Sequence, residues 1–213
     1  MSQTKIGVGM INATSIGDAK LLQGDGAWVT PSAGALTFIS STDISAAATY
    51  DFTGFTAASY DSYVLNVMNL IPATDDVSLE LLTSSNGGSS FDTGASDYSW
   101  GAISSNDTTN TTDASDDSIR INGSTAHALY RFGSAANEDG GSFALHIMAP
   151  HLTKRTTFHW IGTYFSAYTA SELQMFSGGG ARLSSADVDG IRLVFSSGNI
   201  ESGTITAYGL ANS

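Results

Sequence analysis

Short segments that suit β-strands, separated by turn residues, recur along most of this 213-residue chain. From residue 36 onward, runs rich in Val, Ile, Leu, Tyr and Phe follow one another at the spacing typical of sandwiches and jelly rolls. The predicted strands are Leu36–Ser41, Thr49–Phe52, Tyr63–Leu70, Val77–Thr83, Tyr98–Ile103, Ser118–Ile121, His127–Phe132, Phe143–Ala149, Thr156–Tyr164, Leu173–Phe176, Ile191–Ser196 and Thr204–Tyr208. Residues 36–213 are therefore expected to form an all-β, jelly-roll-like antiparallel β-sandwich.

Local composition supports this prediction. The segments Tyr63–Leu70 and Ile191–Ser196 alternate in the way of strands that bury one face. Between strands, Ser85–Gly88 and Glu138–Gly141 carry the Asn, Asp and Gly residues that tolerate positive φ in tight reversals. Only 13% of the residues are charged, so the Glu, Lys and Arg that usually cover helices are scarce. Only Ser184–Val188 is expected to form a helical turn.

The first 35 residues do not show this alternation. Their large apolar side chains, among them Ile6, Val8, Ile11 and Trp28, are separated by Gly, Ala, Ser and Asn without a steady period. Such a stretch cannot enclose a core of its own. We interpret residues 1–35 as an extended N-terminal arm that serves docking or oligomerisation, with a frayed tail as the alternative.

Acidic residues dominate the charge of the chain. The net charge is −12 at pH 7, and residues 21–119 contain thirteen Asp or Glu and no Lys or Arg. Such a surface repels phosphate backbones, so we expect no nucleic-acid partner. Solubility explains it, and an acidic docking face for a basic partner is the alternative. No apolar run approaches the roughly 18 residues of a membrane helix, and no signal peptide is recognisable, so we expect cytoplasmic synthesis without membrane insertion.

A polar, low-complexity loop is predicted over Ser104–Asp117. Its carboxylates at Asp107, Asp113, Asp116 and Asp117 are the kind of ligand that calcium prefers, although the loop does not match the EF-hand pattern. Acidic loops are also often simply solvated. Calcium is therefore a candidate ion at these four residues, and no other cofactor is expected.

Motifs for catalysis are incomplete. The triplet Asp92–Gly94 (Asp-Thr-Gly) resembles that of aspartic proteases, but their chemistry needs a second carboxylate in the same site, and the chain contains one triplet. A turn explains it better. Neither a Gly-x-Ser-x-Gly elbow nor a phosphate-binding loop occurs. The histidines lack the spacings of zinc sites and are interpreted as structural: His127, His146, His151 and His159. We expect no enzymatic activity.

Aromatic residues offer one further kind of site. Tyr98, Trp100, Trp160 and Tyr164 would form a sugar-stacking platform if they shared an exposed face of the sandwich. Aromatic residues of a β-rich chain more often fill the core, and this alternative stays open.

Several segments resemble virion surface proteins of tailed bacteriophages. The resemblance lies in Phe52–Gly54 (Phe-Thr-Gly), the Tyr60-x-x-Tyr63 motif, Asn86–Gly88 and the C-terminal strand ending in Tyr208–Leu210 (Tyr-Gly-Leu). It brackets most of the predicted sandwich domain.

The resemblance implies a jelly-roll-like protein exposed on the particle as a tail-fibre or receptor-recognition module, or as a head decoration (cement) protein. It also implies a homo-oligomer, with a trimer favoured, whose partners are capsid, portal or tail proteins and which contacts a host-surface glycan. No catalytic residues come with it. A free carbohydrate-binding β-sandwich module is the alternative function.

Overall fold

The computed structural model describes residues 21–22, 28–29, 36–56, 59–105, 111–122, 131–134, 140–167 and 173–211. The chain divides into two compact units, residues 1–34 and 35–213, one residue from the predicted boundary. In the first unit, β1 (Leu21–Leu22) pairs antiparallel with β2 (Trp28–Val29), and Leu22 lies opposite Trp28. The arm residues Ile6, Val8 and Ile11 lie outside the described residues.

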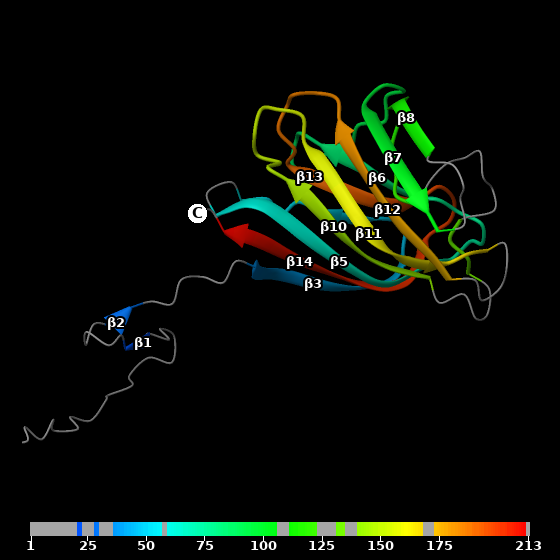
Figure 1. Cartoon of the computed structure of the whole chain (residues 1–213), viewed down its shortest axis with the longest axis horizontal. Helices are drawn as coiled ribbons and strands as arrows, with labels where there is room; N and C mark the ends of the chain where they lie inside the picture. Colours follow the sequence, from blue (N-terminus) through cyan, green and yellow to red (C-terminus); the bar gives the residue numbers. More distant parts are fainter. Residues whose placement is uncertain are drawn as a thin grey trace, which may run out of the picture. The chain divides into compact units, whose positions relative to one another are not determined.

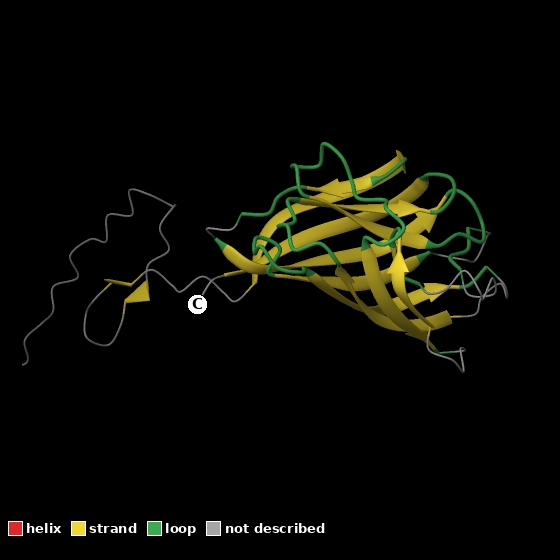
Figure 2. Ribbon diagram, turned by 90° about the horizontal axis from the view of Figure 1, so that it is seen from above, coloured by secondary structure: helices red, strands yellow, loops and turns green. Residues whose placement is uncertain are grey.

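Two antiparallel sheets build the second unit (Figure 1, Figure 2). The larger has the order β3-β14-β5-β10-β11-β12-β7-β8 and the smaller the order β4-β13-β6-β9. The strands are β3 (Leu36–Ala47), β4 (Tyr50–Phe52), β5 (Tyr60–Pro72), β6 (Leu79–Ser84), β7 (Tyr98–Ser104), β8 (Thr111–Asp116), β9 (Ile119–Arg120), β10 (Gly141–Met148), β11 (Thr157–Phe165), β12 (Leu173–Arg182), β13 (Gly190–Phe195) and β14 (Ile200–Ala211). No helix occurs among the described residues, which confirms the all-β prediction.

The strand order is that of a jelly roll with two insertions. Without the excursions β7–β8 and β11–β12, four strands in the order β3-β14-β5-β10 face four in the order β4-β13-β6-β9, and the chain crosses to the other sheet at every step. This arrangement is the eight-stranded double Greek key. The two excursions extend the larger sheet beyond β10, on the side away from β3 (Figure 1).

The core lies between the sheets and follows the predicted alternation. In β5, Tyr63, Leu65 and Val67 are buried while Asn66 and Met68 are exposed; Val64 departs from the alternation, because it lies on the outer face and is still buried. In β13, the alternate apolar residues beginning at Ile191 are buried in the same way. Burying one large apolar side chain contributes roughly 1.5–3 kcal/mol, so a one-residue slip in either strand would expose several such side chains at once.

Four elements differ from the predictions. β3 continues past Ser41 to Ala47, paired with β14. β8 forms inside the loop predicted over Ser104–Asp117, where it pairs with β7 at the edge of the larger sheet. β12 continues past Phe176 to Arg182 through three glycines, of which Gly178 and Gly180 lie against large core side chains. The segment Ser184–Val188 is a loop rather than a helical turn.

The predicted strand His127–Phe132 is described only at its end. Its residues up to Tyr130 lie outside the described part of the chain. Phe132 forms isolated bridges with Val77 and Ser166, so the described end of this segment joins both neighbours without belonging to a named strand. The turn predictions are confirmed at Gly87, Gly88 and Gly140, which all have positive φ.

The residues of the phage-like motif form an aromatic cluster where β4 leads into β5. The ring centroids of Phe52 and Phe55 are 5.1 Å apart, and those of Phe55 and Tyr63 are 4.7 Å apart. The Tyr63 hydroxyl accepts a hydrogen bond from the backbone N–H of Thr56. A Cβ on Gly54 would lie 2.9 Å from the Phe52 ring, which explains the glycine. The motif therefore stabilises a crossing between the two sheets.

Candidate functional site

One row of directly paired residues crosses the outer face of the larger sheet from edge to edge. Residues paired across antiparallel strands project to the same side, so the whole row faces away from the smaller sheet. From β3 to β8 it consists of Phe38, Tyr208, Val64, His146, His159, Gly179, Gly101 and Thr112. Between His159 and Thr112 the row has no side chain larger than a hydrogen atom, because Gly179 of β12 and Gly101 of β7 are paired there.

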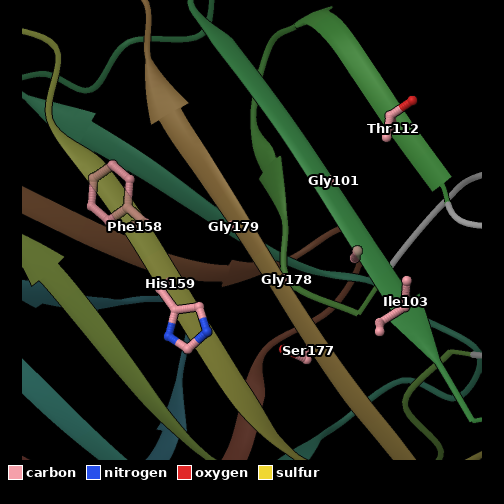
Figure 3. A pocket seen from close by; sticks show the side chains of 9 residues that line it. Gly101, Ile103, Thr112, Phe158, His159, Ser177, Gly178 and Gly179 are labelled. Carbon is pink, nitrogen blue, oxygen red and sulfur yellow. The ribbon is translucent and has the colours of Figure 1, made fainter.

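These glycines form the floor of a groove of about 370 Å³, which we call the glycine groove (Figure 3). It lies between the side chains of His159, Ile103 and Thr112, and Ser177, on the same strand as Gly179, also lines it. A Cβ on Gly179 would meet only the carbonyl oxygen of Phe158, at 3.4 Å. The groove is therefore open because the chain places no side chain there, and the fold leaves space for one.

The glycines on either side of Gly179 have the opposite role. A Cβ on Gly178 would overlap the indole ring of Trp160, and one on Gly180 would press against Ile119 and Trp100 at 3.0–3.2 Å. Large side chains beneath β12 thus require glycine on its inner face. Core packing thus explains the glycines at 178 and 180, and the glycine at 179 leaves the groove open.

An apolar depression of about 230 Å³ adjoins the groove and shares Ile103 and Ser177 with it. Ile161 and Met175 form its other apolar walls. Both are more than half exposed, at 52% and 60%. Groove and depression together form a continuous surface of backbone, hydroxyl and aliphatic groups.

His146 and His159 lie opposite each other on β10 and β11, with ring centroids 5.8 Å apart. Burial lowers the pKa of His146, and the positive charge of His159 lowers it further. His146 is therefore mainly uncharged at pH 7. Sequence spacing missed this pair because the two residues belong to different strands, and only the strand register brings them together.

The outer face of the smaller sheet has the opposite chemistry. Arg192 of β13 lies opposite Asp51 of β4 in a two-pronged ion pair with both N–O distances at 2.7 Å. At the other edge, Arg120 of β9 pairs with Glu80 of β6 at 3.4 Å. Burial raises the pKa of Glu80 even though Arg120 opposes the shift. This face thus carries paired, partly buried charges.

The calcium candidates are placed as follows. The Asp116 carboxylate accepts hydrogen bonds from Trp100 Nε1 at 3.0 Å and Arg120 Nε at 3.1 Å. Burial alone would raise the pKa of Asp116, but the hydrogen bonds from Trp100 and Arg120, together with those from Asp117, outweigh it and lower that pKa. Asp117 lies 3.9 Å from Arg120, Asp113 binds the backbone of Ser115, and Asp107 lies outside the described residues.

Arginine therefore neutralises Asp116 where a cation was predicted. In the described part of the chain, no three Asp, Glu or His side chains are grouped closely enough to hold a metal ion. Calcium binding stays a prediction for the loop as a whole.

The prediction of an aromatic platform is wrong for the four residues on which it rested. Tyr98, Trp160 and Tyr164 are at most 1% exposed and Trp100 is 5% exposed, so none presents a ring face to a ligand. All four project inward from β7 and β11: the Tyr98 hydroxyl accepts a hydrogen bond from the backbone N–H of Thr83 in β6, and the Tyr164 ring stacks on Phe132. The alternative, that they fill the core, holds.

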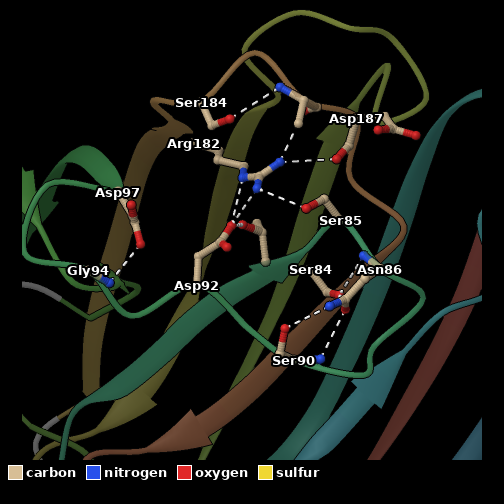
Figure 4. A network of polar contacts seen from close by, with 12 residues as sticks. Ser84, Ser85, Asn86, Ser90, Asp92, Gly94, Asp97, Arg182, Ser184 and Asp187 are labelled. Carbon is tan, nitrogen blue, oxygen red and sulfur yellow. Dashed lines mark hydrogen bonds and ion pairs between the residues drawn. The ribbon is translucent and has the colours of Figure 1, made fainter.

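The Asp-Thr-Gly triplet belongs to a buried polar network (Figure 4). The Asp92 carboxylate pairs with Arg182 at 2.7 Å and accepts a hydrogen bond from Thr83 Oγ1. Arg182 is 4% exposed and also donates to the carbonyl oxygens of Ala186 and Asp187. The network connects β6, β12 and two loops at one end of the sandwich. Asp92 is thus a structural ion-pair partner.

Compared with known proteins, the chain matches no family model, no curated protein and no solved structure. No helix among the described residues is long and apolar enough to cross a membrane.

Proposed function

We propose that this chain is a structural protein of a tailed-bacteriophage virion, exposed on the surface of the particle. The observation that carries the proposal is the jelly-roll strand order, with β3-β14-β5-β10 facing β4-β13-β6-β9, an architecture typical of viral capsid and lectin domains. The phage-like motif supports it, because Phe52, Phe55 and Tyr63 form the cluster at a crossing between the sheets. A net charge of −12 favours an outward position over contact with packaged DNA.

Within the particle, the proposed role is a fibre or receptor-recognition module, or a head decoration protein. The chain would be made in the host cytoplasm and assemble as a homo-oligomer, with a trimer favoured, on capsid, portal or tail proteins. The proposed role is non-enzymatic.

The test is the composition of the particle. Particles of the tailed phage that encodes this chain are purified by density gradient, and peptides of the chain are quantified by mass spectrometry. Gold-labelled antibodies against residues 36–213 then mark the head or the tail. We expect several copies per particle and surface labelling. Presence only in the particle-free lysate would overturn the proposal.

A second candidate function, a carbohydrate-binding module, is favoured by the glycine groove. Shallow grooves lined by hydroxyl, imidazole and backbone groups suit sugar hydroxyls, and Thr112, Ser177 and His159 supply the polar side chains here. Gly179→Val would fill the groove without a clash in the core, since only Phe158 O lies nearby. On a glycan array, this variant should lose the binding that the wild type shows. The control Leu152→Ala, in the turn after β10, should retain it.

A further inference from the structure

Large exposed apolar side chains gather on one face of this protein. In the described part of the chain, nine such side chains are exposed, and eight of them belong to strands of the larger sheet. The pairing register places all eight on its outer face, which we call the open face: Leu36, Phe38, Met68, Ile103, Met148, Ile161, Leu173 and Met175. The ninth, Leu152, lies in a turn. Apolar groups gathered in this way mark a surface that another molecule covers.

The open face also lacks charge where the apolar residues are densest. On β10, β11, β12 and β7, no Asp, Glu, Lys or Arg projects outward, because Arg182 has inward register. The carboxylates of this sheet near the open face lie at its margin: Asp61 is exposed at the start of β5, where the register with β14 shifts, and Asp43 projects outward from β3. The smaller sheet, by contrast, presents Asp51, Glu80 and Arg192 on its outer face. One face is thus suited to water, and the other is not.

The size of the open face matches a stable protein interface. Eight strands spaced about 4.8 Å apart span about 34 Å, and nine paired residues of β11 at about 3.3 Å each span about 30 Å. The product is on the order of 1,000 Å², compared with about 800 Å² per partner in standard interfaces. The glycine groove and the adjoining depression lie within it and offer space for side chains of an opposing surface.

We propose that the open face is buried against the open face or a flank of a second copy of this chain. Charge selects this occupant. Each copy carries a net charge of −12, so two copies repel each other wherever carboxylates meet. A basic partner of another kind would gain most from the acidic surfaces, whereas an identical, equally acidic copy associates best through a surface whose centre, on β10, β11, β12 and β7, carries no carboxylate. The inference rests on the proposed function, in which copies assemble on a particle, and it names the surface they use.

The experiment measures the mass of the full-length chain by light scattering at pH 7.5, together with its circular dichroism. At about 50 µM, above the micromolar limit of dissociation constants for such interfaces, the wild type should have a multiple of the 22.1 kDa chain mass. Met175→Asp and Ile161→Asp place a carboxylate on the open face at side chains that are more than half exposed. Each should raise the dissociation constant at least tenfold and move the mass toward 22.1 kDa.

Leu152→Asp is the matched control, because it adds the same charge at an exposed apolar residue away from the open face. It should leave the assembly intact. Unchanged circular dichroism and an unchanged thermal midpoint show that a variant is folded. If Ile161→Asp does not fold, Met175→Asp alone provides the test.

Three results would overturn the inference. They are a monomeric wild type at this concentration, wild-type mass in both folded variants, or equal dissociation by Leu152→Asp. A monomeric wild type would leave the open face to a different protein. These outcomes are independent of the particle composition that tests the proposed function, because a virion protein can assemble through another surface.

Discussion

Gly178 of β12 lies directly opposite Trp160 of β11, and a Cβ atom on Gly178 would overlap the indole ring. The same Cβ would lie 2.7 Å from the carbonyl oxygen of Gly101 on the other side. Trp160 is fully buried, so its ring cannot move aside without disturbing a close-packed core. An aromatic side chain that covers a glycine across two strands stabilises the sheet at a residue with poor β-propensity.

Gly178→Ala should therefore destabilise the protein by about 1–3 kcal/mol, the usual cost of overpacking a core. Gly179→Ala is the matched control, because its side chain would project into the open groove; it should change stability by less than about 0.5 kcal/mol. Urea denaturation followed by Trp fluorescence measures both. Equal losses in the two variants would contradict the assignment of inner and outer glycines.

Removing the buried arginine should cost more than removing an exposed one. Arg182→Met leaves the Asp92 carboxylate without its cation in a nearly closed site, so we expect a loss of about 3–5 kcal/mol. Arg192→Met breaks the partly exposed pair with Asp51 and should cost less than about 1 kcal/mol. The denaturant midpoints of the two variants test this ranking. A larger loss of stability in Arg192→Met than in Arg182→Met would contradict it.

Acid should weaken the fold through His146. Burial and the charge of His159 lower the pKa of His146 below 6.5, so the unfolded chain binds this proton more tightly. The contribution to stability is fully present above pH 6.5 and is lost as the pH falls through the lowered folded-state pKa. Val64 and Asn66, which face the pair from β5, carry no charge.

NMR titration checks this prediction. His146 should titrate below 6.5, and His159→Gln should raise its pKa, because one positive neighbour is removed. An unchanged His146 pKa in that variant would show that the two imidazoles do not interact electrostatically.

Deleting residues 1–30 tests the N-terminal arm. The sandwich belongs to a separate compact unit, so the truncated chain should keep the thermal midpoint of the full chain. If the arm docks the protein, the truncated chain should no longer attach to virus particles from which this protein is missing. Full attachment of the truncated protein would remove the arm from consideration as the docking element.

Local pattern was sufficient for most of the β-structure. The alternation at Tyr63–Val67 and at Ile191–Phe195 follows from side chains that project to opposite faces of a strand, and turns at Gly87 and Gly140 follow from residues that tolerate positive φ. β8 and the glycine half of β12 were not predictable in this way. Their residues have weak β-propensity, and neighbouring strands and the Trp160 ring hold them in the sheet.

The candidate site was less accessible from sequence. Trp100 and Trp160 were candidates for a ligand platform and are core residues, whereas Ile161 and Met175, which have an ordinary core-like pattern, are exposed. Alternation identifies which residues of a strand share a face, but it does not tell which of the two faces a second sheet will cover.

The sequence by itself determined the all-β class and the approximate position of most strands, because these depend on residues close together in the chain. Only the tertiary structure decided that His146 lies opposite His159, that Gly179 opens a groove, and that eight large apolar side chains share the open face. These features depend on the order and register of strands that are distant in sequence. Non-local pairings of this kind are selected by the packing of the whole sandwich.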